Sequence, residues 1–218
     1  MACAAIIVAS GSSRRMGFDK LAAELHGKPV LVHTVAAFMR AKGISRVIVV
    51  CPGERFQLLE NETYPKPLMR VDGGEQRQHS VANGLAALGD EDLLVAVHDG
   101  ARPLVQPEAI DACIEAAQEY GAATLAHAVA DTLKKADAEG FSRSSVDRTN
   151  LWGMETPQVF QTALLRRAYA GLPPEAIATD EVSVLEAMGI PTKLIVSDFP
   201  NPKITVPADI VLATALMQ

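Results

Sequence analysis

Short apolar, β-branched segments alternate with segments of helical periodicity along most of this 218-residue chain. Such alternation is typical of α/β proteins, in which helices cover both faces of a mainly parallel sheet. The sequence therefore predicts an α/β fold with a doubly wound sheet, which binds ligands beyond the carboxyl ends of its strands. We expect strands at Ala5–Val8, Arg46–Cys51, Met69–Asp72, Leu93–His98 and Ala122–Val129, and helices at Pro29–Ala41, Gln78–Leu88 and Pro107–Tyr120.

The alternation breaks between Asp131 and Asp147, where polar and charged residues separate two short extended segments. This pattern predicts a protruding β-hairpin arm at about residues 131–148. Because an isolated two-stranded hairpin is only marginally stable in water, we expect the arm to pack on a second copy of the chain, giving a homodimer. With no linker in the sequence, residues 1–218 are predicted to form a single domain. Beyond the arm we expect a strand around Gln158–Phe160, helices at Ala163–Ala170 and Asp180–Met188, a strand at Lys193–Val196 and a helix from Pro207.

The charge balance narrows the classes of partner. Twenty basic and 26 acidic residues give a formal net charge of −6, which argues against a nucleic-acid or anionic-membrane surface. The three cysteines form no CxxC pair and are predicted to be reduced core residues of a cytosolic protein. No stretch approaches the roughly 18 apolar residues of a membrane span, so a cytoplasmic location is expected.

The first twenty residues place cations directly after a small-residue loop. An apolar strand at Cys3–Val8 runs into Ala9–Ser13, which is followed by Arg14, Arg15 and Lys20. Small side chains let backbone N–H groups approach an anion, and the cations supply its countercharge. The glycine spacing fits neither a P-loop nor a dinucleotide fingerprint. The pattern predicts another kind of phosphate-binding loop, with a solvated basic turn as the alternative.

Polar residues also follow two later predicted strands. Asp72-Gly73-Gly74 is either a simple turn or a glycine-lined slot for a flat base that Ser80 reads. His98 is interpreted as a structural residue bonded to backbone. Asp99 and Arg102 are expected to face the same crevice, where the carboxylate meets a substrate hydroxyl or a metal.

Three further sequence patterns give weaker evidence about the chemistry of the site. Lys203, among apolar and β-branched neighbours, is either a surface lysine or a further site cation. The histidines form no HxxxH or HxH pair, and no GxSxG sequence occurs, which argues against a zinc site and a hydrolase triad.

A set of short segments runs in order along the chain: Ala9–Met16, Lys20, Asp72–Gly74, His98–Pro103, Asp131-Thr132, Val146–Arg148, Thr156–Gln158, Thr179–Glu181 and Lys203. In this order they resemble the 2-C-methyl-D-erythritol 4-phosphate cytidylyltransferase family. The resemblance implies a Rossmann-like sheet of the nucleotidyltransferase type. It also implies cytidylyl transfer from CTP to methylerythritol phosphate, with release of pyrophosphate, in non-mevalonate isoprenoid synthesis.

The resemblance implies roles for individual residues. The arm that carries Thr132 and Arg148 is expected to cross a dimer interface. Where family members usually have Ala, Asp and Gln, this chain has Ser10, Glu75 and Glu155. The implied catalytic residues are Arg15, Lys20 and Lys203; the implied CTP-binding residues are Ala9, Ser10, Gly11, Gly74, Glu75 and Ser80; and the implied substrate-binding residues are Asp99, Arg102, Thr132, Arg148 and Thr156.

The implied reaction depends on positioning and charge. A phosphate monoester has a second pKa of about 6, so the attacking oxygen is largely ionised at neutral pH and needs no general base. Arg15, Lys20, Lys203 and a Mg²⁺ ion that bridges the CTP phosphates are expected to offset the repulsion between the two anions. No metal site built from protein side chains is predicted.

The sequence leaves two alternative functions open. A ribitol-5-phosphate cytidylyltransferase shares the CTP half of the site, although Val146–Arg148 with Leu151-Trp152 and Thr179–Glu181 look more like the erythritol enzyme. A non-catalytic nucleotide-binding module is the alternative from another class; the presence of Arg15, Lys20 and Lys203 together argues against it.

Overall fold

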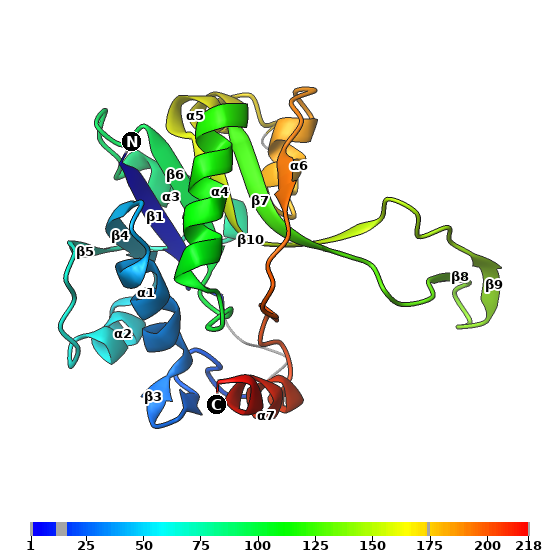
Figure 1. Ribbon diagram of the computed structural model, residues 1–218, viewed down its shortest axis with the longest axis horizontal. Helices are drawn as coiled ribbons and strands as arrows, with labels where there is room; N and C mark the ends of the chain where they lie inside the picture. Colours follow the sequence, from blue (N-terminus) through cyan, green and yellow to red (C-terminus); the bar gives the residue numbers. More distant parts are fainter. Residues whose placement is uncertain (1, 12–16, 174, 218) are drawn as a thin grey trace.

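A mixed seven-stranded sheet forms the centre of the molecule (Figure 1). The structure is a computed structural model and describes residues 2–11, 17–173 and 175–217. The strand order is β11-β7-β10-β6-β1-β4-β5, and every neighbouring pair is parallel except those that β10 makes with β6 and β7. The strands are β1 (Cys3–Val8), β4 (Ile44–Val50), β5 (Leu68–Val71), β6 (Leu94–Asp99), β7 (Ala122–Ala128), β10 (Trp152–Gln161) and β11 (Lys193–Ile195).

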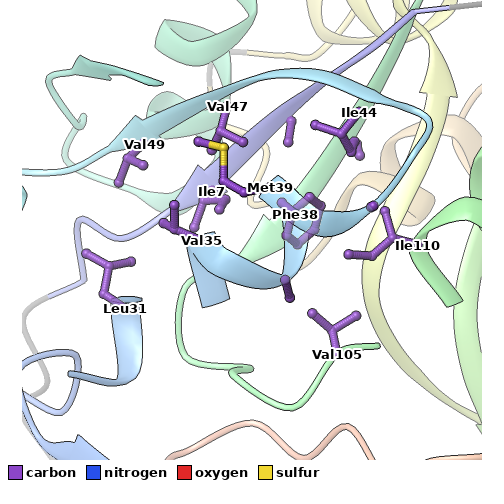
Figure 2. Close-up of a cluster of buried hydrophobic side chains, with 14 of the residues drawn as sticks. Ile7, Leu31, Val35, Phe38, Met39, Ile44, Val47, Val49, Val105 and Ile110 are labelled. Atoms are coloured by element: carbon purple, nitrogen blue, oxygen red, sulfur yellow. The ribbon is translucent and has the colours of Figure 1, made fainter. Parts of the chain in front are cut away.

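Helices pack on both faces of this sheet, as the sequence predicts. Alternate residues of β1 point to opposite sides, so Ile7 joins one buried cluster and Ile6 the other. Figure 2 shows the first cluster, where Phe38 and Val35 of α1 meet Ile7 and Val47 of the sheet. The helices are α1 (Val30–Arg40) and α4 (Pro107–Tyr120) on the first face, α3 (Arg77–Ala86), α5 (Thr162–Ala170) and α6 (Glu181–Glu186) on the second, and α7 (Pro207–Leu216) near the C-terminus.

The predicted strands and helices form within a few residues of their expected bounds. The clearest difference is β10, which begins at Trp152 rather than near Gln158. Its first half contains Gly153, Glu155 and Pro157, which hide the strand pattern, and its pairing with β7 draws the strand out toward the arm. Smaller unpredicted elements are β2 (Glu24–Leu25), β3 (Lys28–Pro29), α2 (Gly53–Phe56) and a 3₁₀ turn at Gln57–Leu59.

The hairpin arm forms where it is predicted. Strands β8 (Lys134–Ala136) and β9 (Ser142–Ser145) pair with each other in a separate two-stranded sheet. The arm extends away from the domain, and every residue of its two strands is exposed (Figure 1). Within residues 2–11, 17–173 and 175–217, no helix is long and apolar enough to cross a membrane.

Candidate active site

The loops that follow β1 and β6 meet at one edge of the sheet. Val8 lies opposite Asp99 in the parallel register, and the Gly100 N–H donates to the Val8 carbonyl at 2.9 Å. The antiparallel strand β10 passes the same edge, where its pairing with β7 shifts register between Met154 and Gln158. This shift takes the intervening residues out of the regular ladder and leaves their side chains free to make other contacts.

Asp99 is the centre of a charged cluster at this edge. Its Oδ2 lies 2.7 Å from the Lys203 ammonium, and its Oδ1 accepts a hydrogen bond from Arg77 Nε at 3.2 Å. Burial alone would raise the pKa of Asp99, but the positive charges of Arg77 and Lys203 outweigh it and hold the pKa well below its usual range. Asp99 is therefore a carboxylate at neutral pH, suited to accepting hydrogen bonds and to holding cations.

Arg77 is held by a second, fully buried carboxylate. Its two terminal nitrogens donate to Glu181 at 2.7 and 2.9 Å, and the Tyr169 hydroxyl donates to the same carboxylate at 3.0 Å. Glu181 follows Asp180, which caps α6 by accepting from the Ser183 N–H at 3.0 Å. Neither Arg77 nor Glu181 is predicted from the sequence to have a role of its own, although Arg77 directly follows the Gly73-Gly74-Glu75-Gln76 segment.

His98 and Thr156 support Asp99 from inside the protein. The Thr156 hydroxyl accepts from the Asp99 N–H at 3.1 Å and lies 2.9 Å from His98 Nδ1, while His98 Nε2 lies 3.1 Å from the Arg102 carbonyl. Burial lowers the pKa of His98 to about 3, so its ring is neutral. His98 is thus structural, as interpreted from the sequence. Thr156 is buried, and its hydroxyl contacts both the Asp99 N–H and the His98 ring.

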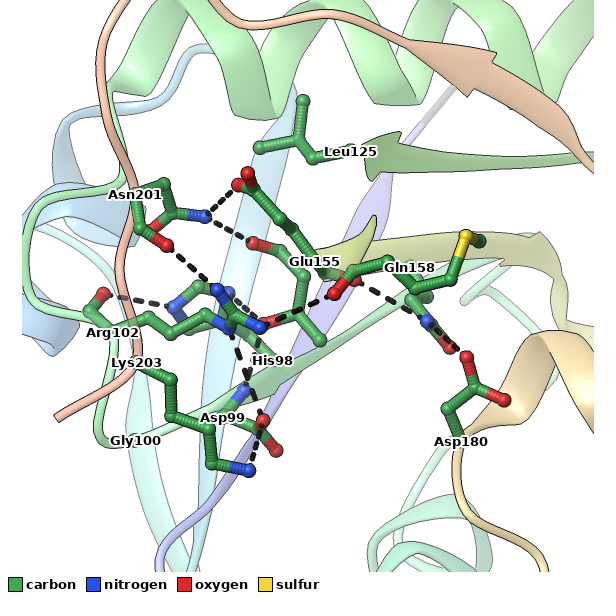
Figure 3. Close-up of polar contacts among 12 residues, drawn as sticks. His98, Asp99, Gly100, Arg102, Leu125, Glu155, Gln158, Asp180, Asn201 and Lys203 are labelled. Carbon is green, nitrogen blue, oxygen red and sulfur yellow. Dashed lines mark hydrogen bonds and ion pairs between the residues drawn. The ribbon is translucent and has the colours of Figure 1, made fainter. Parts of the chain in front are cut away.

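Arg102 lies beside Asp99, but most of its hydrogen bonds point inward. Its guanidinium donates to the Asn201 carbonyl at 2.6 Å and to the Met154 carbonyl at 3.4 Å (Figure 3). Its Nε lies 4.0 Å from Asp99 Oδ2 and makes no hydrogen bond in the structure. Arg102 therefore ties the loop after β6 to the segment that carries Lys203.

The predicted phosphate-binding loop lies next to the predicted base-binding loop. Ala9 is buried, and the hydroxyls of Ser10 and Ser80 are 2.8 Å apart. Ser80 Oγ also accepts from the Gly74 N–H at 3.1 Å, so the two loops are joined through one hydroxyl. Gly11 is exposed, with open space where a side chain would stand. The structure thus brings these predicted CTP-binding residues together.

Neither glycine of the predicted base-binding loop, Gly73 or Gly74, has room for a side chain, for different reasons. A Cβ on Gly73 would lie 2.5 Å from Ser10 Cβ, whereas a Cβ on Gly74 would lie 2.3 Å from His79 Cβ. The family resemblance implies Gly74 as a CTP-binding residue; in the structure, Gly73 is the glycine that faces the Ser10 and Ser80 hydroxyls. Glu75 is exposed at the surface of the loop.

The remaining predicted catalytic cations are Lys20 and Arg15. Lys20 Nζ donates to the Ile204 carbonyl at 2.8 Å, which places it against the segment that carries Lys203. Arg55 donates to the Ala9 carbonyl of the predicted phosphate-binding loop and also forms an ion pair with Asp19. Arg15 lies outside the described residues.

Thr132 and Arg148 lie on the arm and are exposed. Arg148 donates to the Ala130 carbonyl across the foot of the hairpin. Among the contacts of the described residues, none joins these two side chains to the Asp99 cluster. A single copy of the chain therefore assembles only part of the predicted substrate-binding set.

The fold and this edge define an α/β nucleotidyltransferase: a mainly parallel sheet with a small-residue loop after its first strand and lysines gathered beside it. The model of the family described as 2-C-methyl-D-erythritol 4-phosphate cytidylyltransferase matches residues 3–218. The chain belongs to this family.

Individual relatives agree along the whole chain. Two examples among the relatives that carry the family's name show this. The protein from Geobacillus kaustophilus is 41% identical over 220 residues, covering 98% of this chain and 96% of its own. The protein from Caldanaerobacter subterraneus is 39% identical over 226 residues, covering both chains fully.

Solved structures of the family have the same fold. The 4-diphosphocytidyl-2C-methyl-D-erythritol synthase of Anaerococcus prevotii matches with a TM-score of 0.86 and 30% identity, covering 99% of this chain and 96% of that one. The Thermus thermophilus 2-C-methyl-D-erythritol 4-phosphate cytidylyltransferase matches with a TM-score of 0.80 and 34% identity, covering 99% and 98%.

Proposed function

We propose that the edge of the sheet around Asp99 is where the chain transfers a cytidylyl group from CTP to 2-C-methyl-D-erythritol 4-phosphate and releases pyrophosphate. The observation that carries this assignment is the meeting of two lysines from opposite ends of the chain. Lys20 binds the Ile204 carbonyl, and Lys203 in the neighbouring position binds Asp99. Lys20 therefore contacts the same short segment to which Lys203 belongs.

The reaction forms one P–O bond and breaks another. An oxygen of the sugar phosphate attacks the α-phosphorus of CTP, and the electron pair of the breaking bond leaves with pyrophosphate. The attacking phosphate has a second pKa of about 6, so it arrives deprotonated at neutral pH. No side chain has to remove a proton, which agrees with the structural role of the buried, neutral His98 beside Asp99.

The main barrier is the repulsion between two anions, and the cations reduce it. Lys20 and Arg15 follow the phosphate-binding loop and are assigned to the triphosphate. Lys203 is assigned to the phosphate that is transferred, with Asp99 fixing its position until substrate binds. Preorganised charges of this kind lower the barrier most where water is excluded.

Mg²⁺ is assigned to the substrate rather than to the protein. Mg²⁺ prefers oxygen ligands and binds readily to phosphates, so CTP supplies most of its ligands. Bound there, it would neutralise charge that develops on the pyrophosphate.

The second copy of the chain is assigned to complete the acceptor site. The arm presents Phe141, which is 64% exposed, and Trp152 at its foot is 38% exposed. Apolar surface on a protruding hairpin is stabilised by packing on a partner. In this homodimer, Thr132 and Arg148 of the arm reach the acceptor in the partner's site.

The experiment that tests the function is a comparison of two acceptors. The protein is incubated with CTP and Mg²⁺ and either methylerythritol phosphate or ribitol 5-phosphate, and pyrophosphate release is measured. Release with methylerythritol phosphate alone supports the proposal. Release only with ribitol 5-phosphate, or with neither acceptor, overturns it.

A further inference from the structure

We propose that Glu155 and Asn201 are positioning residues that hold Lys203 in its working place. Neither residue is assigned a role by the family resemblance or by the proposed reaction. The inference rests on the proposed function of Lys203, and it is argued from the contacts drawn in Figure 3.

Asn201 is buried and fixed by three neighbours. Its Nδ2 donates to Glu155 Oε2 at 2.9 Å and to the Thr156 carbonyl at 2.8 Å. Its own carbonyl accepts from the Arg102 guanidinium at 2.6 Å. A residue held on the side chain and on the main chain has little freedom to move, and the chain that leaves it starts from a defined position and direction.

Lys203 lies between two anchors. Asn201 fixes the chain on one side, and on the other the Ile204 N–H donates to the Ala101 carbonyl at 2.8 Å. Pro202 connects Asn201 to Lys203 and has a fixed φ, which stiffens the short link. The Lys203 side chain is 37% exposed, so besides its ion pair with Asp99 its position is set by this anchored backbone.

The Glu155 carboxylate holds the Asn201 side chain in place by accepting its hydrogen bond. Glu155 leaves the β10 ladder at the register shift, and its side chain is only 11% exposed. A buried carboxylate needs donors, and this one receives them from Asn201 and from His127 Nδ1, which lies 2.7 Å from Oε1. Its negative charge also acts on the buried guanidinium of Arg102. Glu155 thus anchors the segment that carries Asn201 and Lys203. Its negative charge also offsets the positive charge of Arg102, which donates to the Asn201 carbonyl.

The two residues act through Lys203 and do not contact the reacting atoms. Misplacing a catalytic group by about 1 Å can cost about 10²-fold in rate. We therefore expect loss of the Glu155–Asn201 contact to lower kcat, while CTP still saturates the enzyme near its normal concentration.

The decisive variants change charge and hydrogen bonding without changing shape. In Asn201→Asp a carboxylate replaces the donor that faces Glu155, and we expect kcat to fall by about 10²-fold. In Glu155→Gln the amide oxygen still accepts from Asn201, so kcat stays within about 3-fold of the unmodified enzyme. In the double variant the amide introduced at position 155 donates to the carboxylate introduced at position 201, and we expect at least about 10-fold recovery of kcat over Asn201→Asp.

A second background tests whether the effect passes through Lys203. When Asn201→Asp is added to Lys203→Ala, we expect less than about a 3-fold further loss, because the group that Asn201 positions is already absent. A full additional loss of about 10²-fold would show that Asn201 acts independently of Lys203 and would overturn the inference.

A distant substitution controls for stability. Asp111 accepts the backbone N–H groups of Lys42 and Gly43 at 3.0 and 2.8 Å, away from this edge. Asp111→Asn is expected to lower the melting temperature without lowering kcat. If Asp111→Asn and Asn201→Asp lose activity in proportion to stability, the positioning role is wrong.

The outcomes separate this inference from the proposed function. Full activity of Asn201→Asp with an inactive Lys203→Ala enzyme contradicts the positioning role alone. Full activity of Lys203→Ala contradicts the assigned role of Lys203 in the proposed reaction.

Discussion

The Lys203 ammonium lies 2.7 Å from Asp99 Oδ2, although 104 residues separate the two in sequence. Asp99 ends a central strand, and Lys203 belongs to an irregular segment near the C-terminus. The pair fixes one end of the chain against the middle of the sheet. In the proposed reaction the ammonium passes from this carboxylate to a phosphate, so its charge is already in place when CTP arrives.

Removing either cation of the phosphate-binding region should slow the reaction. We expect Lys20→Ala and Arg15→Ala each to lower kcat by about 10²-fold or more, the scale seen when one preorganised transition-state donor is lost. Steady-state kinetics with saturating CTP measure the effect. Lys28→Ala, which removes a surface ion pair with Glu62, is the matched control and should keep its turnover. Near-normal turnover of the folded Lys20→Ala and Arg15→Ala variants would contradict the assignment of both cations.

The base-binding loop should tolerate bulk at neither glycine, but for different reasons. Gly73→Ala pushes a methyl group against Ser10 and should raise the KM for CTP more than that for the sugar phosphate. Gly74→Val pushes on His79 at the start of α3 and should lower the melting temperature as well. Gly53→Ala, at a position with open space, is the control. An unchanged KM for CTP in Gly73→Ala would place the base elsewhere.

A shared site makes a prediction about mixed dimers. If Arg148 serves the partner's site, a heterodimer of one Lys20→Ala chain and one Arg148→Ala chain contains one doubly altered site and one intact site. Mixing the two inactive proteins under subunit exchange should then restore up to about half of the activity per heterodimer. Each variant mixed with itself is the control. Confirmed heterodimers without activity would show that Arg148 serves its own chain.

Buried His98 should make the fold sensitive to mild acid. Its pKa is lowered to about 3 by burial, whereas an unfolded histidine titrates at about 6.5. As the pH falls below about 6.5 the unfolded chain therefore takes up a proton that the native state does not, and stability is lost at up to about 1.4 kcal/mol per pH unit. Above that pH the contribution is fully present.

The test compares urea unfolding at about pH 7.5 and about pH 5.0, on either side of the unfolded pKa. His98→Gln lacks the titrating ring, so its loss of unfolding free energy between these two values should be smaller than that of the unmodified protein by about 2 kcal/mol. Equal losses in the two proteins would show that His98 is not the group responsible.

The strands of the sheet, the helices and the arm could be predicted from local hydrophobic periodicity. It missed the first half of β10, because Gly153 and Pro157 interrupt the strand pattern and the pairing with β7 comes from distant sequence. Asp99 was expected at the site from its place after a predicted strand, whereas the role of Lys203 came only from the family resemblance. Sequence reasoning missed the Arg77–Glu181 pair, whose members are 104 residues apart and become neighbours only when the first residues of α3 and α6 come together in the fold.

The orientation of individual side chains could not be predicted from the sequence either. A motif places Thr156 and Arg102 at the site but does not tell whether their polar atoms point inward. Both are largely engaged by protein groups. The same limit explains Gly73 and Gly74, which are adjacent in sequence and face different neighbours.

Strand β10 runs as a single strand from the foot of the arm to the site, although its pairing with β7 shifts register between Met154 and Gln158. At about 3.3 Å per residue, Trp152 lies about 10 Å along the strand from Glu155. Trp152 is also the only tryptophan of the chain, and it is 38% exposed where it pairs with Ala128. The protein thus carries a natural optical probe at this junction: its emission spectrum reports whether water or another surface covers the foot of the arm. A simple dilution series, without any label, can follow that change.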